Sequence, residues 1–115
     1  MARHTVELPD LVIPEDGTVS NVIENKLAFA HAVDFVIWGP AALSGTVTVE
    51  VAPNQSPSSG DFSPLQVTPG TDVTVGAGDA PVIAAAGFKA LRLVSGTTET
   101  SERTFRFRAQ VDMAT

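Results

Sequence analysis

The sequence predicts an all-β fold, a single-domain antiparallel β-sandwich or jelly roll of about eight strands that occupies residues 1–115. Three observations lead to this prediction. Val and Thr, which favour strands, are frequent, whereas nine Gly and eight Pro interrupt helices. Apolar and polar residues alternate along several segments, and turn-forming residues recur between these segments. A chain of 115 residues is also long enough to bury one hydrophobic core.

The clearest alternation predicts two half-buried strands, at residues 104–111 and 46–51. In the first, Phe105 and Phe107 share a face with Ala109 and Val111; in the second, three valines share a face. The other predicted strands cover residues 4–13 with a break near Pro9, 26–29, 33–38, 62–68, 72–75, 82–85 and 88–94. Residues 20–24 and 80–87 are candidates for short helical turns.

Turn chemistry separates the predicted strands. Gly, Pro, Asp and Ser gather at residues 14–17, 39–40, 53–60, 69–70, 76–79 and 95–98. The segment at residues 53–60 is too short to separate two domains, so we interpret it as an exposed connection.

Charge and cysteine content exclude several classes of function. The net charge is −6, which disfavours binding to nucleic acids and to anionic membranes. The chain contains no cysteine, which excludes disulfides and thiolate chemistry. The N-terminal residues lack the apolar core of a signal peptide, and the longest apolar run, residues 33–38, is interrupted by Asp34. These features predict a soluble protein that is synthesised in the cytoplasm.

No motif in the sequence predicts a catalytic or metal site. His4 and His31 do not have the spacing of a metal-binding pair, and no serine lies in a Gly-x-Ser-x-Gly frame. The Gly-Ala-Gly segment at residues 76–78 lacks the third glycine and the lysine of a phosphate-binding loop. We therefore expect no enzymatic activity, no metal and no cofactor.

Positive charge is concentrated late in the chain. Five of the seven basic residues are Lys89, Arg92, Arg103, Arg106 and Arg108. If residues 88–94 pair with residues 103–111, then Arg92, Arg106 and Arg108 share one outward face that can dock onto an acidic protein partner. The alternative is a solvated sheet face with scattered charges.

Trp38 is a candidate exposed aromatic residue that can stack on a sugar, because an indole ring offers an apolar face with a donor at its edge. The alternative role for Trp38, at the end of an apolar run, is packing in the core or at its rim.

The order of five segments resembles a family of small β-sandwich virion proteins of tailed bacteriophages. The matching segments are LVIPEDGTVS at 11–20, FVIWGP at 35–40, LSGTVTVEV at 43–51, LRLVSGT at 91–97 and ERTFRFR at 102–108. They cover most of the chain, and their order is more specific than any one of them. The third turn of the family pattern is replaced here by residues 53–60.

The resemblance implies a capsid decoration (cement) protein that binds the outer capsid surface and stabilises the head by bridging subunits of the major capsid protein. Such a protein would lie on the virion, with a trimer as the preferred oligomer and a monomer as the alternative. Residues 1–7 would serve as an N-terminal arm over a neighbour, with Arg3 and His4 as contact residues. Two other functions compete: a carbohydrate-binding or adhesion module, and a tail or head–tail connector component.

Overall fold

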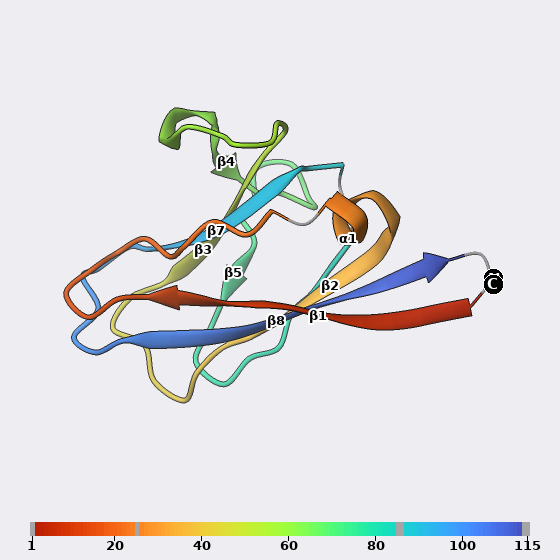
Figure 1. Ribbon diagram of the computed structural model, residues 1–115. Helices are drawn as coiled ribbons and strands as arrows, with labels where there is room; N and C mark the ends of the chain where they lie inside the picture. Colours follow the sequence, from red (N-terminus) through yellow and green to blue (C-terminus); the bar gives the residue numbers. More distant parts are fainter. Residues whose placement is uncertain (1, 25, 85–86, 114–115) are drawn as a thin grey trace.

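The computed structural model describes residues 2–24, 26–84 and 87–113, and it shows two antiparallel sheets (Figure 1). Sheet A has the order β1-β8-β2-β6 and consists of β1 (Ala2–Ile13), β8 (Arg103–Met113), β2 (Ala32–Trp38) and β6 (Val82–Ala84). In sheet B, β3 (Val47–Ala52) pairs with β7 (Ala90–Ser95) and also with β4 (Ser63–Pro64) and β5 (Thr74–Val75). Two short helices complete the fold, α1 (Lys26–His31) and the 3-10 turn η1 (Ser59–Asp61). The predicted all-β sandwich is confirmed.

Residues 18–23, which we call the edge strap, complete sheet B. The strap runs antiparallel along β7 through bridges from Val19 to Val94 and from Ile23 to Leu91. If β4 and β5 count as one interrupted row, sheet B has the order strap-β7-β3-β4/β5 opposite β1-β8-β2-β6. Along the chain, the rows then alternate between the sheets at every step except the one from β3 to β4. This alternation is the topology of a jelly roll.

The hydrophobic core lies between the two sheets. Sheet A contributes Leu11, Ile13, Phe35, Ile37, Ile83, Phe105 and Phe107, and sheet B contributes Val47, Val49, Val75, Leu91 and Leu93, all of them buried. The alternation predicted for residues 46–51 and 104–111 places Val47, Val49, Phe105 and Phe107 inward, as the pleat of a strand requires. Burial of each such aliphatic or aromatic side chain contributes roughly 1.5–3 kcal/mol.

Residues 26–29 form part of helix α1, so the strand predicted for them is wrong. The chain must cross here from the strap at the edge of sheet B to β2 in sheet A. The Lys-Leu-Ala-Phe-Ala segment has good helix propensity, and periodicity cannot separate a strand from a helix over so few residues. The Phe29 ring packs edge-on against Phe35 and Phe88, at centroid distances of 5.3 and 5.4 Å. With six residues, α1 is the longest helix in the described part of the chain, far below the length that crosses a bilayer.

The two candidate helical turns are not helical in the described residues. Residues 20–23 belong to the strap, where the Ser20 hydroxyl accepts a hydrogen bond from the Leu93 N–H at 2.8 Å and so replaces a backbone partner. Residues 82–84 form β6, and residues 85–86 of the other candidate lie outside the described residues.

Strand β1 includes the segment that was predicted to be an arm. Residues 2–7 pair with β8 in continuous register, from Ala2 opposite Met113 to Glu7 opposite Arg108. They are therefore not a free arm in this chain, and Met1 lies outside the described residues. Figure 1 shows β1 and β8 running side by side out to the two ends of the chain. The predicted break near Pro9 is a shift of register between Leu8 and Leu11.

The predicted turns punctuate the sheets. Residues 14–17 close a turn in which Gly17 N–H donates to the Pro14 carbonyl at 3.0 Å. Gly70 and Gly78 have φ of +86° and +73°, in the left-handed region that glycine tolerates. The strand predicted for residues 62–68 is reduced to β4, because residues 66–72 leave the sheet and fold on themselves through a Gln66–Asp72 hydrogen bond of 2.8 Å.

Candidate protein-binding face

The basic residues near the C-terminus do not share one face. Strand β7 pairs with β3 in sheet B, whereas β8 lies between β1 and β2 in sheet A. Residues 88–94 therefore do not pair with residues 103–111, so the condition for a shared face of Arg92, Arg106 and Arg108 is not met. In a jelly roll these consecutive strands lie in opposite sheets, so the sandwich separates Arg92 from Arg106 and Arg108. The backbones of two stacked sheets lie about 10 Å apart, and side chains on their outer faces are farther apart still.

Arg92 is engaged by the fold on the outer side of sheet B. Its Nε donates to the Glu50 carboxylate at 2.9 Å, and the two residues are paired in register across β3 and β7. The guanidinium lies 4.1 Å from the centre of the Phe62 ring, and it also donates to the Ser59 hydroxyl at 3.2 Å. Only 14% of the Arg92 side chain is exposed, so most of its capacity for contacts is used within the chain.

Arg106 and Arg108 lie together on the outer face of sheet A. Their neighbours Phe105, Phe107 and Ala109 are buried, so the arginines point outward. Arg108 forms an ion pair with Glu7 on β1, and its guanidinium carbon lies 5.2 Å from the centre of the Trp38 ring on β2.

Arg106 is exposed and has no ion pair within the described residues. On β2, Arg106 is paired in register with Trp38. On β1, Leu8 pairs with Phe107 and Leu11 pairs with Phe105, and the bulge between them lies next to Arg106. No residue of β1 is therefore in register with Arg106, and its charge is available to a partner.

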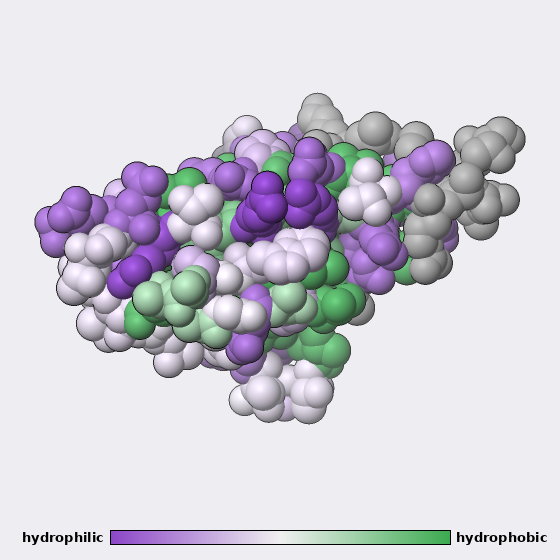
Figure 2. Space-filling view, turned by 90° about the horizontal axis from the view of Figure 1, so that it is seen from below, coloured by the Kyte–Doolittle hydropathy of each residue, from purple (hydrophilic) through white to green (hydrophobic). Residues whose placement is uncertain are grey.

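Apolar side chains extend this face beyond the arginines. Trp38 is 37% exposed, and Val82 on β6, opposite Val36 on β2, is 67% exposed. We call the set of Trp38, Val36, Val82, Arg106 and Arg108 the Trp38 face. Figure 2 views the molecule from below, and it shows strongly hydrophilic side chains next to hydrophobic ones. An aromatic ring and arginines beside the exposed Val82 and the half-buried Val36 have the composition of a protein-interface core.

Two other predicted contact residues, Lys89 and His4, lie away from the Trp38 face. Lys89 is exposed directly before β7, where its N–H donates to the Ala52 carbonyl of β3 at 2.8 Å. His4 is exposed on β1 opposite Val111, toward the chain ends. The backbone of Arg3 pairs with Asp112, but the side chain of Arg3 lies outside the description. The structure thus brings Arg106 and Arg108 together with Trp38, and it separates them from Arg92 and Lys89.

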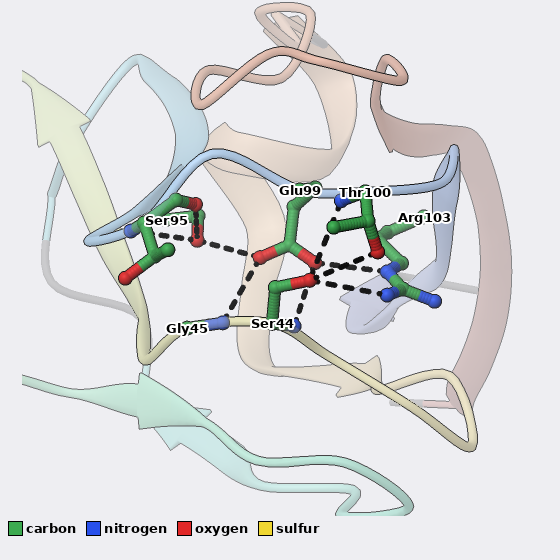
Figure 3. Close-up of polar contacts among 7 residues, drawn as sticks. Ser44, Gly45, Ser95, Glu99, Thr100 and Arg103 are labelled. Atoms are coloured by element: carbon green, nitrogen blue, oxygen red, sulfur yellow. Dashed lines mark hydrogen bonds and ion pairs between the residues drawn. The ribbon is translucent and has the colours of Figure 1, made fainter.

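A buried carboxylate that the sequence did not reveal closes one end of the sandwich. The side chain of Glu99 is fully buried and accepts four hydrogen bonds (Figure 3). The donors are the N–H groups of Ser44 and Gly45 at 2.9 and 3.2 Å, the Ser95 hydroxyl at 2.7 Å and Arg103 Nε at 2.8 Å. They come from the loop before β3, the end of β7 and the start of β8, so Glu99 joins the two sheets.

Close packing of the backbone makes this cluster possible. Gly45 approaches the chain so closely that a Cβ there would meet the Thr97 backbone nitrogen at 2.8 Å. The backbone of Glu99 also holds the turn at residues 14–17, because its carbonyl accepts from Asp16 N–H at 2.8 Å and its N–H donates to Gly17 at 3.0 Å. The only sequence signal for the cluster is the spacing of four residues between Glu99 and Arg103, which is unremarkable outside a helix.

The electrostatics of Glu99 suit a structural role. Burial alone raises the pKa of this carboxyl, but the four donors, led by the Ser44 N–H, outweigh burial and lower the pKa of Glu99 from 4.5 to about 2. A general acid or base is most effective when its pKa lies near the working pH. Glu99 is instead a permanently ionised acceptor at neutral pH.

Among the described residues, no three His, Asp or Glu side chains are grouped so that they could hold a metal ion.

Comparisons with protein-family models, with curated proteins and with solved structures found no match to this chain.

Proposed function

We propose that this chain is a non-enzymatic structural protein that docks its Trp38 face onto an acidic surface of a larger protein assembly. The observation that carries the proposal is the exposed Arg106, which has no ion pair within the described residues, beside the exposed ring of Trp38. In a chain of net charge −6, this cation is a local exception that favours an acidic partner over a basic one. Trp and Arg are also the residues that most often carry binding energy in interfaces.

The family resemblance supplies the specific form of this proposal. The chain is then a capsid decoration protein of a tailed bacteriophage, carried on the virion, and its partner is the major capsid protein. Repeated binding over a symmetric lattice, or binding as a trimer, would multiply a weak contact through avidity. The jelly-roll topology is compatible with this role, although a fold by itself does not assign a function.

The geometry of Trp38 argues against its use as a platform for sugars. The Arg108 guanidinium lies over the ring, so one face of the indole already has a cation–π partner inside the chain. This contact also holds the ring in place for a protein partner, because it limits the conformational freedom that binding would remove.

The test is co-sedimentation of the purified chain with assembled capsid shells that lack it. We expect saturable binding by the wild type and a loss of at least about tenfold in affinity for Arg106→Glu, because the reversed charge would face an acidic surface. The matched control is Lys89→Glu, which makes the same charge reversal at an exposed position away from the Trp38 face. Equal losses in both variants, or no saturable binding by the wild type, would overturn the proposal.

A further inference from the structure

A concave site lies away from the Trp38 face. It has a volume of about 490 Å³ and is lined by Phe29, Ala30, Asn54, Gln55 and Lys89. These residues come from α1, from the connection after β3 and from the residue before β7, three segments that are distant in sequence. The volume falls within the range of small-molecule sites.

One wall of this pocket is held in place by hydrogen bonds. The Glu24 carboxylate accepts from Ser56 N–H, and Ser56 has a φ of +48°, which is unusual for a residue with a side chain. The Asp61 carboxylate accepts from Ser58 N–H at 2.9 Å and from Asn54 Nδ2 at 3.3 Å. The connection at residues 53–60 is therefore exposed, as predicted, but it is anchored at several points.

The floor of the pocket is an oriented aromatic ring. Phe29 is half-buried, and its edge-on contacts with Phe35 and Phe88 fix the plane of the ring. Such a ring offers a flat apolar surface to a ligand.

Three polar groups around this floor are not used by the fold. Lys89 forms no ion pair, and the side-chain amide of Gln55 and Oδ1 of Asn54 have no hydrogen-bond partner, within the described residues. The nearby carboxylates of Glu24 and Asp61 accept bonds from the loop itself. Among the described lining residues, the groups left for a ligand are therefore one ammonium, one complete amide and one amide oxygen.

We infer that this pocket binds an acidic sugar unit of the uronic acid type. The apolar face of a sugar ring would lie against Phe29, and its vicinal hydroxyls match the donor and acceptor of the Gln55 amide. The carboxylate of the sugar would pair with the Lys89 ammonium. This site is independent of the docking function proposed for the Trp38 face, because the two share no residue.

The test is a titration of the ¹⁵N-labelled full chain, followed by the backbone amide signals of Asn54, Gln55 and Lys89. The probes are glucuronate, glucose as the neutral sugar, and acetate as the carboxylate alone. We expect saturable shifts with glucuronate, and binding of glucose and of acetate that is weaker by about tenfold or more.

Lys89→Gln should abolish the preference for glucuronate over glucose, while Arg106→Ser, on the other sheet, should preserve it. The absence of saturable shifts with glucuronate, or equal binding of glucose or acetate, would overturn the assignment. Co-sedimentation with shells is unaffected by Lys89→Gln if both proposals hold, so the failure of one is separable from the failure of the other.

Discussion

The Glu99 cluster and the Trp38 face use similar residues in opposite ways. At one end of the sandwich, Arg103 meets a buried carboxylate, and four donors converge on Glu99. On the outer face of sheet A, Arg106 forms no ion pair with a carboxylate of the described residues, and it lies beside the exposed indole of Trp38. Arg92 is used by the fold in the same way as Arg103, because it forms an ion pair with Glu50 and lies over the ring of Phe62. The cross-strand neighbours of a charged side chain, rather than its position in the sequence, decide whether it stabilises the fold or remains available to a partner.

The largest effect is expected from Glu99→Ala, which would leave buried donors and the Arg103 guanidinium without their acceptor. The free energy of unfolding should fall by about 3–5 kcal/mol, a large fraction of the stability of a small domain. Denaturant unfolding measures this loss. The matched control is Glu102→Ala, which removes an exposed carboxylate three residues away and should change stability by less than about 0.5 kcal/mol. Similar values for the two variants would remove the distinction between the two regions.

Acid should weaken the first region. The pKa of Glu99 is lowered from 4.5 to about 2 in the folded chain, so its contribution is fully present above pH 4.5 and is lost as the pH falls toward 2. The expected size of this loss is about 3 kcal/mol. Urea unfolding at a series of pH values should show it as a slope between about pH 5 and pH 2. A Glu99→Gln variant should lack this part of the slope; an unchanged slope would contradict the prediction.

The smallest change in stability is expected when either of two arginines with different neighbours is replaced. Arg92→Ser should lower stability by about 1–2 kcal/mol, because it removes the ion pair with Glu50 and the contact with Phe62. Arg106→Ser should change stability by less than about 0.5 kcal/mol. Thermal unfolding of both variants at neutral pH checks the difference. A larger loss for Arg106→Ser would mean that the fold also uses this residue.

Much of the fold was predictable because strand periodicity is a local signal. Residues 46–51 and 104–111 alternate clearly, and the pleat buries their apolar side chains as predicted, except that Val51 is only partly buried against the core. The strand predicted for residues 26–29 was wrong because a short apolar segment fits a strand and a helix equally well. Only the crossing of the chain from one sheet to the other makes this segment helical. The strap was not predicted as a row of sheet B because the Ser20 hydroxyl and the Asn21 amide supply hydrogen bonds that pattern analysis cannot count.

The candidate sites were less predictable, since they depend on which strands are neighbours. Arg106, Arg108 and Trp38 were each singled out from the sequence, but β2 and β8 are neighbours only because the chain closes as a jelly roll. Glu99 has polar neighbours in sequence and is typical of an exposed turn. Its burial follows from the close approach of Gly45 to Thr97, a contact between residues far apart in the chain.

By itself, the sequence determined the class of the fold, the inward and outward faces of the long strands, and the places where the chain turns. These properties follow from side-chain periodicity and from the backbone preferences of Gly, Pro and Asp, which act over a few residues. Only the tertiary structure decided which strands pair, which arginine meets a carboxylate and which is left exposed. Those outcomes depend on long-range pairing, where a change of neighbour moves a charge from a satisfied site to an open one.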